Sequence, residues 1–126
     1  MGTKVLVVDD TLEAVQLLSL MLETSGFEPV TSLTSEKAMR LAKEEGPKAA
    51  LLDLLMPEVD GLEICRRLRA DPETNHMGII IVTAANEPDV AARVESAGAD
   101  RLIYKPVDMA DLVGALNEVL AARGLA

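Results

Sequence analysis

Four positions in this sequence carry polar residues that could hold a metal ion and a phosphoryl group. Each follows a short apolar run: Asp9-Asp10, Asp53, Thr83 and Lys105. Oxygen ligands suit Mg²⁺, which keeps several of its waters and needs only one or two carboxylates. The Thr83 hydroxyl and the Lys105 ammonium suit phosphate oxygens. A carboxylate in such a site could itself attack a phosphoryl group and form an aspartyl phosphate.

The charges in such a cluster must balance. Three carboxylates repel one another in a partly desolvated site, and Lys105 offsets only part of their charge. A divalent cation would supply the rest. Asp9 and Asp10 are adjacent, so we assign this pair to the metal. Asp53 stands alone at the end of the central strand, before a loop long enough to form a pocket wall, and we assign it as the phosphoryl acceptor.

Short apolar runs predict the strands that would position these residues. They span residues 4–8, 49–52, 79–82 and 102–104, and a weaker run spans 28–32. The runs at 4–8 and 79–82 are almost continuously apolar, as in strands covered on both faces.

Helical patterns separate the runs. The first two predicted helices span residues 12–24 and 35–45, and a third ends near Asp71-Pro72. A fourth runs from an N-cap at Asn86 to Gly98, and Asp108 caps the fifth. The first is expected to bury Ala14, Leu17, Leu18, Met21 and Leu22, and the last Met109, Leu112, Val113, Leu116 and Leu120.

This order, strand then helix five times, predicts an α/β fold with a parallel sheet and right-handed crossovers. Five units are too few for an eight-unit barrel, so an open, doubly wound sheet with helices on both faces remains. Ligands of such sheets bind outside the carboxyl ends of the strands. The four polar positions should therefore meet in one crevice.

Composition excludes several other classes of protein. The 126 residues suit one domain, and 12 basic against 21 acidic residues give a net charge of −9, which disfavours nucleic-acid binding. No apolar run approaches the roughly 18 residues of a membrane span. The single cysteine, Cys65, is compatible with a reducing compartment, and we expect a cytoplasmic protein.

Each of these residues also has an ordinary explanation. Asp9 and Asp10 could cap the first helix, Thr83 could be a strand residue, and Lys105 could be a solvated surface charge. Their occurrence at four successive strand ends favours a site.

The sequence resembles the receiver domain of bacterial two-component response regulators from Lys4 to about Leu120. The motifs that carry the resemblance are Val7-Val8-Asp9-Asp10, the segment LDLLMPEVDG at 52–61, Val82-Thr83-Ala84, and Ala97-Gly98-Ala99-Asp100 leading to Lys105-Pro106. Together, in this order, they are highly specific.

The resemblance implies a flavodoxin-like (βα)5 fold with strand order 2-1-3-4-5, and one receiver domain over residues 1–126 with no output domain in this chain. It implies that Asp53 accepts a phosphoryl group from a histidine kinase or phosphotransfer protein. Asp10, Asp53 and the backbone carbonyl of Leu55 would hold Mg²⁺, with Asp9 acting through the metal's waters. Thr83, Lys105 and the N–H of Ala84 would contact the phosphoryl group, and the Lys105–Pro106 bond would be cis.

The output would be a shift between two conformations, without turnover of an external substrate. The family often has an aromatic residue three positions before the lysine, where this chain has Leu102; its only tyrosine, Tyr104, lies on the same face of the strand. Tyr104 could serve instead, the switch could use no aromatic residue, or Tyr104 could only pack. Exposed apolar residues at Leu12 and Val15 could dock the kinase. The domain would be a monomer or dimerise on phosphorylation.

Two other functions stay open. A phosphohydrolase would also form an aspartyl phosphate. Such enzymes carry the motif Asp-x-Asp after the first strand, however, and here Asp9 and Asp10 are adjacent. A degenerate receiver that binds partners without phosphorylation would fit the missing switch aromatic.

Overall fold

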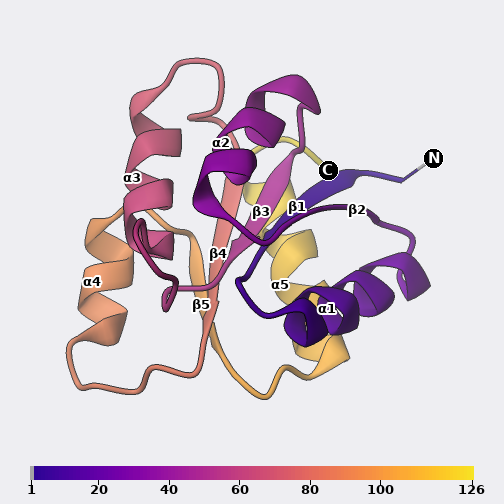
Figure 1. Ribbon diagram of the computed structural model, residues 1–126. Helices are drawn as coiled ribbons and strands as arrows, with labels where there is room; N and C mark the ends of the chain where they lie inside the picture. Colours follow the sequence, from indigo (N-terminus) through magenta and orange to yellow (C-terminus); the bar gives the residue numbers. More distant parts are fainter. Residues whose placement is uncertain (1) are drawn as a thin grey trace.

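The computed structural model describes residues 2–126 and has three layers, with a parallel sheet between two layers of helices (Figure 1). The strands are β1 (Lys4–Val8), β2 (Glu28–Ser32), β3 (Ala49–Leu52), β4 (Gly78–Thr83) and β5 (Arg101–Tyr104). The helices are α1 (Leu12–Thr24), α2 (Ser35–Glu44), α3 (Gly61–Ala70), α4 (Val90–Ser96) and α5 (Met109–Ala122). None of the helices described is long and apolar enough to cross a membrane.

The strand order is β2-β1-β3-β4-β5, and every pair is parallel. This confirms the predicted fold class and order. Burial follows the apolar pattern, because β3 and β4 are buried along their whole length while β2 and β5 are partly exposed at the edges. Pro29 lies in an edge strand, where a missing N–H costs least.

Each face of the sheet has its own core. Leu6, Leu52 and Ile81 point to the face covered by α2, α3 and α4, and Val7, Leu51 and Ile80 point to the face covered by α1 and α5 (Figure 1). Alternate residues of one strand thus serve opposite cores, which is why the central strands read as continuous apolar runs.

Helix α1 is rotated relative to the prediction. It buries Val15, Leu18 and Leu22, whereas Leu17 is 51% exposed. Val15 is therefore a core residue, and its predicted role in an exposed docking surface is wrong. α1 is apolar around most of its circumference, so spacing alone could not decide which leucines face the sheet. Leu12 is exposed, as expected.

Two smaller predictions are also wrong. Helix α4 begins at Val90 after the cap residue Asp89, three residues beyond the start predicted with Asn86 as the cap. That earlier start would make Glu87 helical, but a residue before proline avoids the α region, and Pro88 follows. In α5, Asp108 is the cap as expected, but Met109 is exposed rather than buried.

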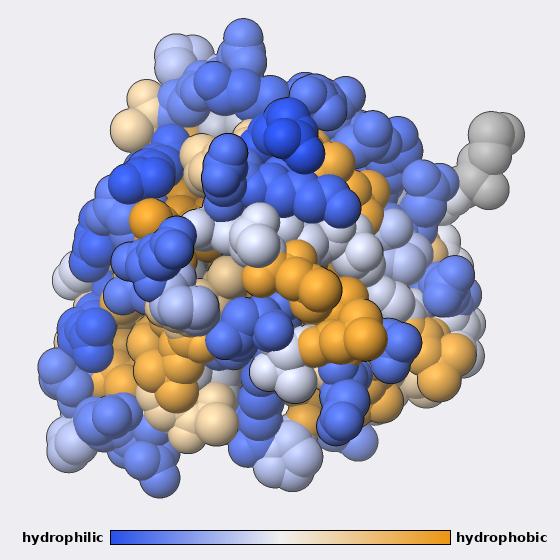
Figure 2. Space-filling view, viewed as in Figure 1, coloured by the Kyte–Doolittle hydropathy of each residue, from blue (hydrophilic) through white to orange (hydrophobic). Residues whose placement is uncertain are grey.

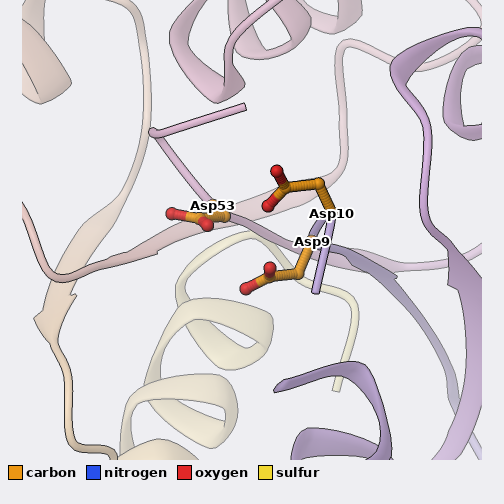
Figure 3. Close-up of side chains that lie close together, drawn as sticks. All are labelled: Asp9, Asp10 and Asp53. Carbon is orange, nitrogen blue, oxygen red and sulfur yellow. The ribbon is translucent and has the colours of Figure 1, made fainter. Parts of the chain in front are cut away.

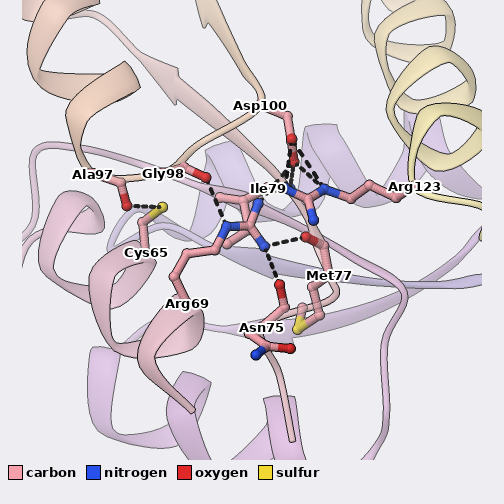
Figure 4. A network of polar contacts seen from close by, with 9 residues as sticks. All are labelled: Cys65, Arg69, Asn75, Met77, Ile79, Ala97, Gly98, Asp100 and Arg123. Carbon is pink, nitrogen blue, oxygen red and sulfur yellow. Dashed lines mark hydrogen bonds and ion pairs between the residues drawn. The ribbon is translucent and has the colours of Figure 1, made fainter. Parts of the chain in front are cut away.

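A polar network ties together the edge of the sheet where the strands begin (Figure 4). Asp100, just before β5, accepts hydrogen bonds from Arg123 at the end of α5, from Arg69 of α3 at 3.0 Å, and from the N–H of Ile79 at 2.8 Å. Arg69 also donates to the carbonyl of Gly98. One carboxylate thus fixes two helices and two strands.

Replacing Asp100 should destabilise the fold in a pH-dependent way. Burial alone would raise the pKa of Asp100, but Arg123, the Ile79 N–H and Arg69 outweigh it and hold that pKa below its ordinary value. A depressed carboxyl pKa stabilises the fold above the unfolded pKa of about 4, and this contribution is lost as the pH falls through the folded value. We expect Asp100→Asn to lower the free energy of unfolding by about 3 kcal/mol at pH 7, because it leaves two arginines without their partner. Urea titrations between pH 7 and pH 3 should show this difference shrinking in acid; a constant difference would contradict it.

Glu58 adopts a left-handed backbone conformation in the loop between β3 and α3, with φ of 65°. This costs an L-residue about 1 to 2 kcal/mol, which exceeds the entropic cost of glycine there. We expect Glu58→Gly to raise the free energy of unfolding by about 0.5 to 1 kcal/mol. Glu87→Gly, in an exposed loop position without positive φ, should lower it. The same sign for both variants in urea titrations would argue against strain at Glu58.

Candidate functional site

Three carboxylates meet at the carboxyl edge of the sheet (Figure 3). Oxygens of Asp9, Asp10 and Asp53 all lie within 4.8 Å of one another. Strand pairing brings them together: the N–H of Asp53 donates to the carbonyl of Val8 at 2.9 Å. Asp9 and Asp53 are buried and Asp10 is exposed. The structure confirms the prediction that the Asp9-Asp10 pair and Asp53 meet in one crevice.

Lys105 enters the same crevice from beyond β5. Its Nζ lies 2.8 Å from Asp9 Oδ2 and 3.6 Å from Asp53 Oδ2. The peptide bond between Lys105 and Pro106 is cis. The backbone N–H of Lys105 donates to the carbonyl of Thr83 at 2.9 Å, which fixes the start of this loop against β4. Lys105 therefore spans the two buried carboxylates.

The carboxylates and the lysine perturb one another. Burial, and then the negative charge of Asp9, raise the pKa of Asp53; the N–H of Leu55 and the Lys105 ammonium oppose this only in part. Burial lowers the pKa of Lys105, but its contacts with Asp9 and Asp53 outweigh burial and leave that pKa raised. The site therefore carries more negative charge than Lys105 can offset. The atoms in it that could bind a metal ion are all carboxylate oxygens. This donor set fits a hard divalent cation.

Thr83 lies at the end of β4 and is fully buried. Its Oγ1 accepts a hydrogen bond from the N–H of Ala85 at 3.1 Å, while Ala84 between them is exposed. Thr83 is paired with Tyr104 of β5. Tyr104 is 48% exposed, whereas Leu102 packs partly buried against the core under α3 and α4. Of the two expected switch positions, only Tyr104 has a largely free side chain.

The loop from β3 to α3 depends on a glycine for which the sequence reasoning gave no role. A Cβ on Gly61 would collide with the backbone carbonyl of Asp53. Asp60 caps α3 by accepting from the N–H of Glu63 at 3.0 Å, and the N–H of Leu55 donates to Asp53 Oδ1 at 3.2 Å. The sequence shows a glycine at this position but not the carbonyl beside it, so its role depends on the fold.

The ordinary explanation of Asp9 and Asp10, as caps of the first helix, is wrong, because the cap residue of α1 is Thr11. Asp9 Oδ1 accepts from the N–H of Thr11 at 2.9 Å and so shapes the turn into α1, whose cap residue is Thr11. The other oxygen of Asp9 remains with Lys105. Asp9 therefore both turns the chain and holds the lysine.

Comparison with known proteins agrees with this geometry. The sequence profile of the response regulator receiver domain matches residues 5–117. The phosphate regulon transcriptional regulatory protein PhoB of Rhizobium meliloti is 37% identical over 93% of the chain, which spans 52% of that regulator. The response regulator PleD of Caulobacter vibrioides is 33% identical over 86% of the chain, which spans only 24% of it.

Other relatives are matched along nearly their whole length. The polar-differentiation response regulator DivK of Brucella ovis is 30% identical, with 95% of the chain and 98% of DivK covered. The crystal structure of a response regulator receiver domain protein from Clostridium thermocellum superposes with a TM-score of 0.89 at 30% identity, covering 99% of the chain and 98% of that protein. With the acidic cluster, Thr83 and Lys105 at the ends of the matching strands, the chain belongs to the response regulator receiver domain family.

Proposed function

We propose that this receiver domain accepts a phosphoryl group on Asp53 from a phosphohistidine of a histidine kinase or phosphotransfer protein. The observation that supports it best is the position of Asp53, buried between two other carboxylates and a lysine at the carboxyl edge of the sheet. In the transfer an Asp53 Oδ–P bond forms as the N–P bond of the donor breaks. The donor imidazole leaves with the electron pair of that bond.

Asp10, Asp53 and the backbone carbonyl of Leu55 would hold Mg²⁺, with Asp9 acting through its waters. Asp10 is the exposed member of the cluster, so it can be reached from solvent, while Asp9 is already committed to Lys105. When bound, the ion offsets the negative charge of the carboxylates and of the incoming phosphoryl oxygens.

Lys105, Thr83 and the N–H of Ala84 would bind the oxygens of the phosphoryl group. Lys105 already lies 3.6 Å from Asp53 Oδ2 and can transfer its contact from Asp9 to the new anion. Thr83 would rotate its hydroxyl toward the phosphoryl group, giving up the hydrogen bond from Ala85. These new bonds would bias the domain toward a second conformation, with either Tyr104, which is paired with Thr83, or Leu102, which is paired with Ile81, responding.

The partners that follow are proteins: a phosphodonor that reaches Asp53, with Leu12 at its docking surface, and a downstream protein that recognises the second conformation. The domain would assist its own phosphorylation and dephosphorylation, in the cytoplasm, without turning over an external substrate. It would be a monomer or a phosphorylation-dependent dimer, and its net charge of −9 disfavours direct contact with nucleic acid.

Mg²⁺ should stabilise the folded domain by binding to it and not to the unfolded chain. At about ten times the dissociation constant, the gain is about 1.4 kcal/mol, or about 5 °C in Tm for a domain of this size. Thermal unfolding with MgCl2 and with EDTA would measure this shift. In Asp10→Asn the shift should be much smaller, and an equal shift in this variant would remove Asp10 from the metal site.

Incubation with a small phosphodonor and Mg²⁺ should add one phosphoryl group to the protein, as measured by intact mass. Asp53→Asn and an EDTA-treated sample should gain none. An adduct on Asp53→Asn would place the acceptor elsewhere. No adduct on the wild type from any donor would favour a degenerate receiver, and sustained release of phosphate from a phosphomonoester would favour a phosphohydrolase.

A further inference from the structure

The net negative charge of the chain is concentrated at the carboxyl edge of the sheet. Twelve of the 21 acidic residues lie in the loops that follow the strands or in the first three residues of the helices after them. Of the 12 basic residues, only Lys37 and Lys105 lie there. Figure 2 shows hydrophilic residues along the lower border of the molecule, where Figure 1 draws the loops after β4 and β5. The rest of the chain is close to neutral, so the charge of −9 acts at the edge that holds Asp53.

The ion pairs divide the molecule in the same way. At the edge where the strands begin, exposed acids have cationic partners, as in Lys4–Glu45 and Lys43–Asp71. At the carboxyl edge, Lys105 is already held by the two buried carboxylates. Within residues 2–126, none of the exposed acids of the carboxyl edge takes part in an ion pair. Their charge therefore acts outward, on whatever approaches the site.

Most of these acids have a structural role at helix N-termini. Asp60 and Asp108 cap α3 and α5. Glu13, Glu36 and Asp111 lie in first turns, where the helix dipole favours negative charge. Because all five helices begin at this edge, helix stability alone collects acids there.

Glu58 and Glu87 are not explained in this way. Both are exposed, in the loops from β3 to α3 and from β4 to α4, three residues before each helix begins. The cap residues of these helices are Asp60 and Asp89. The loop of Glu58 returns to the site, because the N–H of Gly61 donates to the carbonyl of Leu54, next to Asp53. The loop of Glu87 follows Thr83 on the neighbouring strand.

A phosphodonor must approach Asp53 against this negative field. Asp53 is only 6% exposed, so the donor passes the loops before it reacts. At low ionic strength, one carboxylate at about 10 Å disfavours each negative charge of the donor by about a factor of two. The effect therefore grows with the charge of the donor. Acetyl phosphate carries one negative charge more than phosphoramidate at neutral pH, because the nitrogen of phosphoramidate is protonated.

We infer that Glu58 and Glu87 are specificity-determining residues whose charge slows phosphorylation of Asp53 by small acyl phosphates relative to less negative donors. This inference rests on the proposed function. The two glutamates act on the approach of the donor and not on the reacting atoms. A phosphohistidine on a basic protein surface escapes this repulsion, whereas a free acyl phosphate does not.

The test compares acetyl phosphate with phosphoramidate on the same variants. In both reactions an Asp53 Oδ–P bond forms. The P–O bond of acetyl phosphate breaks with loss of acetate, or the P–N bond of phosphoramidate breaks with loss of ammonia, and the leaving group keeps the electron pair. Initial rates are measured by intact mass at low ionic strength and saturating Mg²⁺.

The main variant is Glu58→Gln with Glu87→Gln, which removes two charges at nearly constant side-chain size. Glu58→Asp with Glu87→Asp keeps both charges. The matched control is Glu23→Gln with Glu28→Gln, because these two exposed glutamates lie at the opposite edge of the sheet.

We expect the main variant to raise the ratio of the acetyl phosphate rate to the phosphoramidate rate about fourfold, a factor of about two for each glutamate. In about 0.5 M NaCl this gain should largely disappear. The variant that keeps the charges and the matched control should both retain the wild-type ratio. Because only the ratio is compared, a shared change in Mg²⁺ affinity or in the reactivity of Asp53 cancels.

Three results would each overturn the inference: an unchanged ratio in the main variant, an equal rise in the matched control, or a rise that persists at high salt. A wild type that gains no phosphoryl group from either donor would instead refute the proposed function.

Discussion

The structure depends on balancing negative charge where a buried parallel sheet ends. Parallel strands bring all their carboxyl ends to one edge, so residues far apart in sequence place three carboxylates within 4.8 Å. Two of them are buried, and such charges are costly without a partner. Lys105 supplies that partner at 2.8 Å from Asp9, reaching from the end of β5 past the ends of β4 and β3. It cannot offset all three, and the excess negative charge is what would attract a cation to this edge.

The two edges of the sheet handle charge in opposite ways. At the edge where strands begin, Asp100 has two arginines and a backbone N–H, so one partly buried carboxylate is fully paired (Figure 4). At the other edge, carboxylates outnumber their cationic partner (Figure 3). The first arrangement holds α3, α5 and two strands in one geometry. The second leaves an edge whose most favourable arrangement would change if a cation or a phosphoryl group bound there, while the rest of the fold is held in place.

The sequence was sufficient for the strands and for the meeting of Asp9, Asp10, Asp53 and Lys105, because strand order and burial follow from apolar runs and parallel connections. It was insufficient wherever a choice depended on packing. Helix α1 offers leucines on several faces, and only contact with the sheet selects Val15, Leu18 and Leu22. Gly61 could be recognised only once the Asp53 carbonyl was seen beside it.

The chemistry of such a site cannot by itself choose a partner. In the proposed reaction Lys105, Thr83 and a cation would bind features that every phosphohistidine shares, so they would contribute the same free energy whichever protein presents the group. Discrimination must then come from residues outside the reaction, on surfaces that the donor covers on its way to Asp53. In this chain the exposed residues after the strands differ: Leu12, Leu33 and Leu55 follow β1, β2 and β3, whereas Ala84, Asn86 and Glu87 follow β4. Residues of this kind would let the choice of partner change by substitution on the surface, while the charge balance that maintains the site is left intact.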